Sequence, residues 1–296
     1  MPEPPKGAID VPTTPVTSKP PTLPQSVLDV QVLVNSSGNC VPSFQQNDYQ
    51  DLVPVQNAKN SRTIASAGCG LCAWASLLAA AGCLVPVFDP DTKTFSAPAA
   101  GAATVDPRTL LQYFVNYSLS QTKTAAEAKS WAATHLFEPA NAGVVLNKSP
   151  DVKAAVDKLV TLSNPSATAR LDNTVSNVGT KTGSDLPQVT AGLKAGNPSL
   201  LVVCFPGTDC SGGGDHQVLA VGIAKIDKST YYVVTDSGFP TYDPLPALKS
   251  GGYVTTGTLY SCLAGKKAKT YVSFYRYRVL GGLQPLTGFQ LKPLFP

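Results

Sequence analysis

The stretch that most restricts the fold of this chain is residues 70–81, GLCAWASLLAAA, which carries no charged side chain. A helix over these residues would be apolar on every face, and such a helix is stable only where protein surrounds it. Gly82 and Pro86 end the helical pattern. We therefore expect a buried central helix with the other elements packed around it.

Along the rest of the chain, helical patterns come first and strand patterns follow. Amphipathic periodicity predicts helices at residues 106–117, 124–136, 149–162 and 185–195, with a polar stretch at residues 163–183. Alternation of apolar and polar residues predicts strands at residues 27–34, 199–205, 216–224, 231–235, 253–260 and 270–279. Helices followed by antiparallel strands are typical of an α+β fold.

The two ends of the chain differ in composition from its middle. Residues 1–26 hold eight prolines among Thr, Ser and Lys, which favours an extended arm that docks on a protein partner. We assign residues 27–282 to one domain, with a helical insertion at about residues 90–195. Residues 283–296 are expected to form a C-terminal tail.

Charge and hydropathy exclude two kinds of function. The chain has 23 Lys and Arg against 19 Asp and Glu, without long runs of like charge, so we expect no nucleic-acid binding. Residues 67–88 approach the length of a membrane span, but they are mostly Ala, Gly, Cys and Leu and include Pro86, so we expect no membrane span. The N-terminus lacks the pattern of a secretory signal. We expect a cytoplasmic protein, unless it is virion-associated or exported by another route.

Cys69 stands between Gly68 and Gly70 at the start of the predicted central helix. Backbone N–H groups and the helix dipole at such a position favour the thiolate, which is the nucleophilic form of cysteine. Flanking glycines would let a substrate carbonyl approach the sulfur. Cys69 is therefore the candidate nucleophile.

The chain has two histidines, so the candidate bases are few. His216 opens a predicted strand after a glycine-rich loop, whereas His135 follows Trp131 on a predicted helix, where a structural role is favoured. The next strand returns antiparallel and ends at Asp236, which should bring this carboxylate beside His216. Cys69, His216 and Asp236 would then be the nucleophile, base and orienting acid of thiol acyl transfer.

An acyl-transfer site also needs donors to the oxyanion. The backbone N–H of Cys69 can supply one, and the side-chain amide of Gln45 or Gln46 in FQQNDY can supply another. The run QNDY with RTIASAGCG resembles the motif of papain-fold cysteine peptidases related to the bacteriocin-processing, double-glycine leader peptidases. TVDPRTLLQYF, LKAGNPSLLVV, DHQVLAVGI and YYVVTDSG are similar to later segments of that family, so the likeness runs over residues 44–238.

This resemblance implies a papain-like fold in which Gln46 is the oxyanion donor and Cys69 the nucleophile. It assigns the base and the acid to His216 and Asp236, and it implies no cofactor. The chain departs from the family pattern at Leu71-Cys72, where Pro-Thr is usual, and at Ser237, where Pro is usual.

Several alternatives remain open on the sequence. CGLCAW also resembles the CGxCW signature of papain, in which the second cysteine, here Cys72, is the nucleophile, but Trp74 is displaced by one position. The CxxC could also be redox-active or half of a zinc site, although a second CxxC is missing. Asp236 could cap a turn, and Cys204 and Cys210 could form a disulfide in an oxidising setting.

Two functions of different classes fit these features. The first is a cysteine peptidase or amidase acting on a peptide, a protein leader or a peptidoglycan cross-link. The second is a structural or assembly protein, for example a phage virion component, that keeps a papain-like scaffold with weak or no activity. A fold alone does not choose between them.

Overall fold

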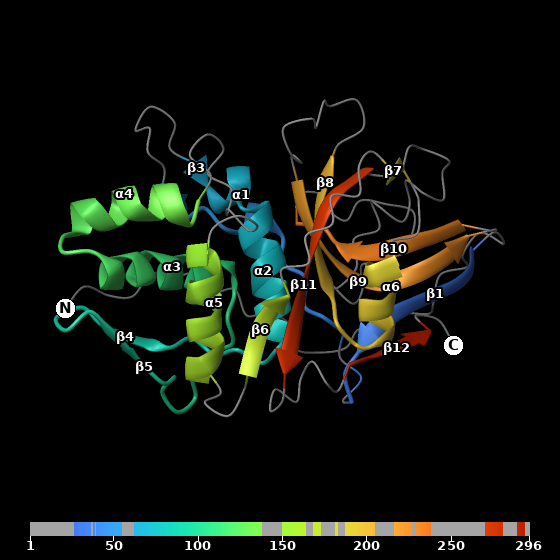
Figure 1. Cartoon of the computed structure of the whole chain (residues 1–296), viewed down its shortest axis with the longest axis horizontal. Helices are drawn as coiled ribbons and strands as arrows, with labels where there is room; N and C mark the ends of the chain where they lie inside the picture. Colours follow the sequence, from blue (N-terminus) through green and yellow to red (C-terminus); the bar gives the residue numbers. More distant parts are fainter. Residues whose placement is uncertain are drawn as a thin grey trace.

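The computed structural model describes most of the helices and strands of the chain (Figure 1). The described residues are 27–36, 38, 40–54, 62–137, 150–163, 168–172, 181–182, 187–204, 216–226, 229–237, 270–280 and 289–293. The proline-rich segment at residues 1–26 and the strand expected at residues 253–260 lie outside these ranges.

Most of the described helices occupy one side of the molecule, and the main sheet, with one helix on it, occupies the other (Figure 1). The helices are η1 (Gln46–Asp48), α1 (Ile64–Ala67), α2 (Cys69–Ala80), α3 (Pro107–Gln121), α4 (Ala125–His135), α5 (Pro150–Ser163) and α6 (Pro187–Lys194). Residues 70–78 of α2 are all buried, which confirms the central helix that the uncharged run predicts. Helix α2 packs against α3 on one side and against the sheet on the other.

Strands of the main sheet pair only in antiparallel fashion over the described residues. They are β1 (Val27–Val34), β6 (Thr168–Asp172), β7 (Lys181–Thr182), β8 (Ser199–Cys204), β9 (His216–Ile226), β10 (Ser229–Thr235), β11 (Thr270–Leu280) and β12 (Gln290–Pro293). Their order is β12-β1-β9-β8-β11-β6, with β10 added to β9 and β7 to β11. The fold is therefore α+β, as predicted.

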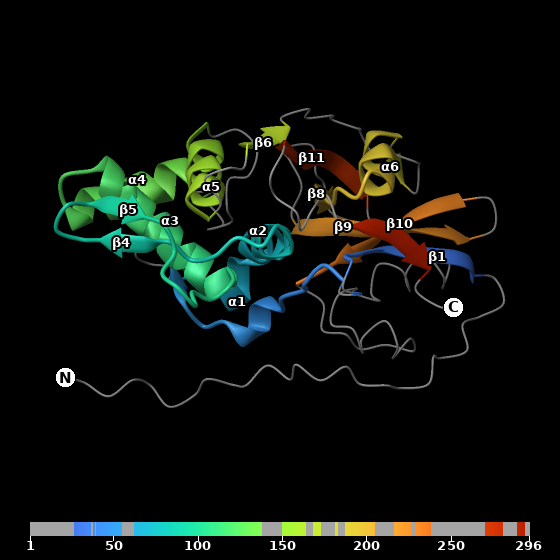
Figure 2. The same ribbon diagram turned by 90° about the horizontal axis from the view of Figure 1, so that it is seen from below.

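Strand β9 lies at the centre of this sheet because three other strands pair with it. Strand β10 follows one edge of β9 from Leu219 to Ile226. On the other edge of β9, β8 pairs with residues 216–220, and β1 pairs with the residues from Gly222 to Ile226. Helix α2 packs on β9, and Figure 2 shows α2 beside the start of that strand, while α6 covers the sheet.

Gly222 lies where β8 gives way to β1 along the edge of β9. A Cβ atom at this residue would come within 2.2 Å of the backbone oxygen of Gln31 and 3.1 Å of the Val32 Cα. Both neighbours are backbone atoms, so the strands would have to separate to admit any side chain. The position therefore requires glycine for the close approach of two strands.

We expect Gly222→Ala to lower the free energy of unfolding by at least about 2 kcal/mol, because the added methyl group overpacks a strand junction. Gly101→Ala is the matched control: Gly101 has φ of +77° and nothing within 4 Å of an added Cβ. Its cost should be backbone strain alone, roughly 1 kcal/mol. Urea denaturation of both variants measures the difference, and equal losses would contradict the assignment.

The predicted elements agree with the described ones to within a few residues, with one extension. Helix α3 runs to Gln121, one turn beyond the predicted end at residue 117. Its start is fixed by Asp106, whose carboxylate accepts a 2.7 Å hydrogen bond from the Thr109 N–H. Ser149, the first residue of the helix predicted at residues 149–162, lies outside the described residues.

Several short strands were not predicted. The hairpin β4 (Val87–Asp89) and β5 (Thr94–Ser96) lies among the helices, and β6 and β7 fall in or next to the polar stretch at residues 163–183. Strand β12 falls in the segment 283–296 that was expected to be a tail, and it pairs with β1. Strands of two to five residues carry too few alternations to give a pattern, and pairing with distant strands stabilises them.

No helix in the described part of the chain could span a bilayer. Helix α2, the most apolar candidate, has 12 residues. It is therefore about 18 Å long, short of the ~30 Å hydrocarbon core of a membrane.

Candidate functional site

Cys69 is held at the start of α2 by a tight junction with α1. At the start of α1, the Ser66 hydroxyl accepts a 2.9 Å hydrogen bond from the Thr63 N–H and donates a 3.0 Å hydrogen bond to the Thr63 carbonyl oxygen. Gly68 ends α1 and precedes α2, and a Cβ atom there would lie 2.4 Å from Ile64 Cγ2. Gly68 is thus needed for packing against Ile64, a reason different from the open approach that the sequence suggested. The junction leaves Cys69 as the first residue of α2, partly exposed.

The Cys69 thiol forms a hydrogen bond with the imidazole of His216. Burial raises the pKa of this thiol, but the hydrogen bond and positive charge of His216 lower it, and so do the N–H groups of Gln217 and Gly70. The net result is a Cys69 pKa below its usual value. The site therefore favours the thiolate at a residue that is partly exposed.

His216 and Asp236 meet as neighbouring strand ends. His216 begins β9 and Asp236 directly follows β10, and the two side chains lie 2.6 Å apart between Nε2 and Oδ1. His216 is 5% exposed and Asp236 is fully buried. Since the carboxylate accepts the Nε2–H of the ring, Nδ1 is the nitrogen left to face Cys69.

Opposing effects set the protonation of His216. Burial alone would lower the pKa of its imidazole, but the hydrogen bonds and negative charges of Asp236 and Cys69 together raise it to about 9. A thiol with a lowered pKa beside an imidazole with a raised pKa favours a thiolate and imidazolium at neutral pH. The sequence placed Asp236 near His216 from the antiparallel return of β10, and the structure has them in contact.

Gln46 lies against the elements that carry both the nucleophile and the acid. Its backbone N–H donates to the Ser237 carbonyl oxygen at 3.1 Å, and its side-chain Nε2 donates to the Ala65 oxygen in α1 at 2.8 Å. The Ser237 hydroxyl donates to Gln46 Oε1 at 3.3 Å. One N–H of the Gln46 amide has no partner among the described residues and can serve an oxyanion.

Gln45, the other glutamine considered from the sequence, points elsewhere. Its Nε2 donates to the backbone oxygen of Asp236 at 3.4 Å, a long hydrogen bond. The side chain of Gln46 instead contacts Ala65, in the helix that leads to Cys69. The side-chain amide of Gln46 therefore contacts the helix that precedes Cys69, whereas that of Gln45 contacts the backbone of Asp236.

Cys72 has a different environment from Cys69, although both lie in the first turns of α2. Its side chain is 1% exposed and its thiol bonds to Ser237. Burial first, and then the negative charge of Cys69, raise the pKa of Cys72. A buried thiol held protonated is a poor nucleophile, so the geometry favours Cys69.

Ser237 is the residue at this site that sequence reasoning missed. It is buried, follows Asp236 directly and bonds to both Gln46 and Cys72. Its departure from the family pattern was visible in the sequence, but its contacts come from segments nearly two hundred positions away. Only the folded arrangement of η1, α2 and β10 reveals them.

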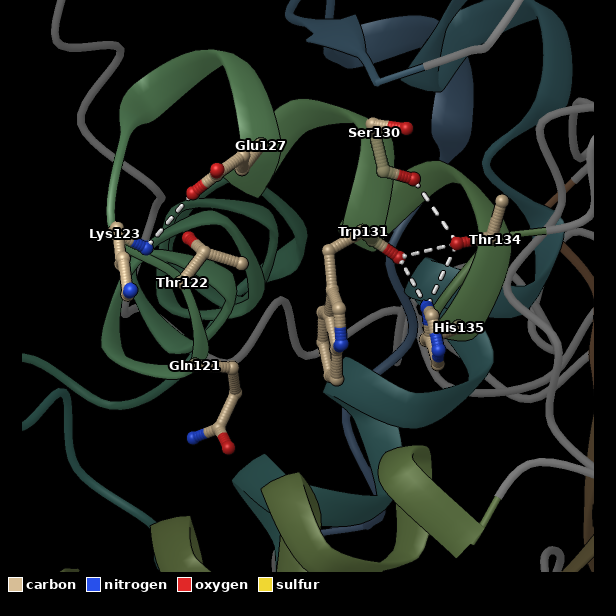
Figure 3. A pocket seen from close by; sticks show the side chains of 8 residues that line it. All are labelled: Gln121, Thr122, Lys123, Glu127, Ser130, Trp131, Thr134 and His135. Atoms are coloured by element: carbon tan, nitrogen blue, oxygen red, sulfur yellow. Dashed lines mark hydrogen bonds between the residues drawn. The ribbon is translucent and has the colours of Figure 1, made fainter.

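His135 lies in a separate part of the molecule, at a shallow hollow between the end of α3 and α4 (Figure 3). Its ring stacks on Trp131 with centroids 4.4 Å apart and planes 5° apart. Its Nδ1 bonds to the Trp131 backbone oxygen at 2.9 Å. These contacts belong to helix packing, in keeping with the structural role favoured for His135.

Two further sequence expectations concern cysteines and metals. Within the described residues, no group of three or more His, Cys, Asp or Glu side chains is placed to hold a metal ion. Cys210 lies outside those residues, and so does any bridge between it and Cys204.

Comparison of the chain with models of known families, with curated proteins and with solved structures found no match.

Proposed function

We propose that this chain is a cysteine peptidase or amidase that cleaves an amide bond through Cys69, His216 and Asp236. The observation that carries the proposal is the line of contacts from the thiol of Cys69, a partly exposed residue, through His216 to the buried Asp236. Nucleophile, base and orienting acid in that sequence of contacts are the components of thiol acyl transfer. The likeness of residues 44–238 to double-glycine leader peptidases further supports a papain-like fold.

The proposed reaction has two stages. The Cys69 thiolate attacks the amide carbonyl carbon, and the carbonyl oxygen becomes an oxyanion. The His216 imidazolium gives its proton to the amide nitrogen, the C–N bond breaks and an amine leaves, so that a thioester remains on Cys69. Neutral His216 then takes a proton from water as that water attacks the thioester, which releases a carboxylic acid and restores the thiolate.

Two donors are available to the oxyanion in this proposal. Cys69 is the first residue of α2, so its backbone N–H has no acceptor within the helix. The second donor is the free N–H of the Gln46 amide, oriented by the hydrogen bonds to Ala65 and Ser237. Donors fixed before the reaction stabilise the developing charge without reorganisation.

The substrate class stays a proposal: a peptide, a protein leader or the peptide part of peptidoglycan. The alternative function, an assembly protein with an inactive site, makes a different chemical prediction. An activated ester can acetylate a reactive thiol even in an inactive scaffold, but such a scaffold would not hydrolyse the thioester that forms, so it would show no turnover. Repeated release of p-nitrophenolate from p-nitrophenyl acetate, beyond one equivalent per chain, can therefore test for the hydrolase before any natural substrate is known.

Gln46→Ala is expected to slow acylation by p-nitrophenyl acetate on the order of 10²-fold, because acyl transfer passes through an oxyanion. Alkylation of Cys69 by iodoacetamide forms no oxyanion, so its rate should stay within about twofold of the unsubstituted protein, well under the loss of one oxyanion donor. Stopped-flow release of p-nitrophenolate and intact mass after alkylation measure the two rates.

Gln50→Ala is the matched control, since Gln50 is exposed and its side chain bonds only to the Asn47 oxygen among the described residues. Neither rate should change in that variant. An equal fall of acylation and alkylation in Gln46→Ala would show that Gln46 supports the structure around Cys69, and it would remove the oxyanion role.

A further inference from the structure

Cys69 and Cys72 are spaced to be bridged by a disulfide. They lie three residues apart within α2, and helix geometry places Cα atoms at this spacing about 5 Å apart. Disulfides join cysteines whose Cα atoms are roughly 4.4–6.8 Å apart. The negative charge of Cys69 also acts on the Cys72 thiol, so the two sulfur atoms lie within electrostatic reach of each other.

The two thiols differ in exposure and in protonation. In such a pair, the exposed cysteine reacts with the oxidant, and the second cysteine, called the resolving cysteine, then forms a disulfide with it. Cys69 is partly exposed and bonds to His216, so it can meet a solute as a thiolate. Cys72 is buried beneath it and bonds to Ser237. Oxidants therefore reach Cys69 first, and the Cys72 thiol can react only with the oxidised sulfur of Cys69. Oxidation-sensing cysteines combine this accessibility with a neighbouring second thiol.

We propose that Cys69 and Cys72 are a reversible oxidation site, at which hydrogen peroxide converts the two thiols to a disulfide. The Cys69 thiolate attacks one peroxide oxygen, the O–O bond breaks, and the leaving hydroxide takes the His216 proton to become water. Cys69 is then a sulfenic acid. The Cys72 sulfur attacks the Cys69 sulfur, the S–O bond breaks, and the hydroxyl leaves with the Cys72 proton as a second water.

This modification has a consequence for the nucleophile. A disulfide on Cys69 removes the thiolate, and a thiol reductant restores it by exchange. Without Cys72, further oxidation of the sulfenic acid leads to sulfinic acid, which thiols do not reverse. The proposal goes beyond amide hydrolysis, because it requires the reactive Cys69 thiolate but no acyl transfer.

The test uses the full chain with Cys83→Ser, treated with hydrogen peroxide and then with an alkylating agent. Trypsin releases residues 63–93 as one peptide, because no Lys or Arg lies between Arg62 and Lys93. Cys83 is the third cysteine of this peptide, and burial raises its pKa to about 12. In the Cys83→Ser background, the peptide contains Cys69 and Cys72 alone.

We expect the peptide to lose two hydrogens and resist alkylation, and dithiothreitol should restore both thiols. Adding Cys72→Ser should abolish the disulfide and give oxygen adducts of Cys69 instead, with labelling by dimedone at an early stage. Circular dichroism before treatment verifies that each variant is folded. The proposal would be overturned if the yield of sulfinic acid were the same with and without Cys72. It would also be overturned if Cys72 stayed reduced in peptides whose Cys69 is oxidised. A protein that fails to acylate but forms this disulfide would reject only the hydrolase function.

Discussion

Cys69→Ala is expected to abolish acylation by p-nitrophenyl acetate and the fast phase of alkylation by iodoacetamide at neutral pH. The reason is that Cys69 is the described cysteine whose thiol bonds to an imidazole and whose pKa is lowered. Loss of a catalytic nucleophile typically reduces turnover on the order of 10⁴-fold or more. Single-turnover kinetics with each reagent measure both losses.

Cys72→Ala provides the matched control for this result. It removes a thiol from the same helix, but one that is buried and held protonated. We expect this variant to keep both the acylation and the fast alkylation, with a modest loss of stability from the small cavity. Rapid labelling that survives in Cys69→Ala and disappears in Cys72→Ala would reverse the assignment.

His216→Ala is expected to change both the rate and the pH dependence of Cys69 alkylation. In the native site, the lowered pKa of Cys69 increases the thiolate fraction at neutral pH, so the alkylation rate should depend less on pH than that of an ordinary cysteine. Without His216, the pKa of the Cys69 thiol should rise, because the hydrogen bond and the positive charge of His216 that lower it are gone while burial remains. At pH 7 the thiolate fraction, and with it the alkylation rate, should therefore fall by about tenfold or more.

The raised pKa of His216 also sets the alkaline limit of amide cleavage. The imidazolium persists as pH rises through its usual pKa of about 6.5 and is lost near pH 9. The leaving amine then has no proton donor, so amide hydrolysis should fall above pH 9 while alkylation continues. Asp236→Asn should move this alkaline limit to lower pH, because the carboxylate supports the imidazolium. An unchanged limit in that variant would contradict the role of Asp236.

The parts of the fold that were predictable from the sequence are those with a strong local pattern. The uncharged run at residues 70–81 allowed only a buried helix, and α2 is that helix. The antiparallel return from β9 to β10 follows from one short turn, so the approach of Asp236 to His216 could be inferred from two neighbouring strands. Glycines on both sides of Cys69 singled out the start of the helix.

Other features depend on segments that are distant in sequence, and no local pattern records them. The need for glycine at position 222 comes from the close approach of its paired strand β1, and β12 forms by pairing with β1. Ser237 acquires its importance from Gln46 and Cys72, which come from η1 and α2. Such contacts become visible only when the whole arrangement of elements is known.

The most direct test of the central claim is the intact mass of the protein, quenched in acid during its reaction with p-nitrophenyl acetate. We expect one acetyl group per chain, mapped to Cys69 within the tryptic peptide 63–93 and absent in Cys69→Ala. Treatment with hydroxylamine at neutral pH should remove it, as it does a thioester. An acetyl group on Cys72, or no acetyl group on a protein whose Cys69 is rapidly alkylated, would contradict acyl transfer by Cys69, His216 and Asp236.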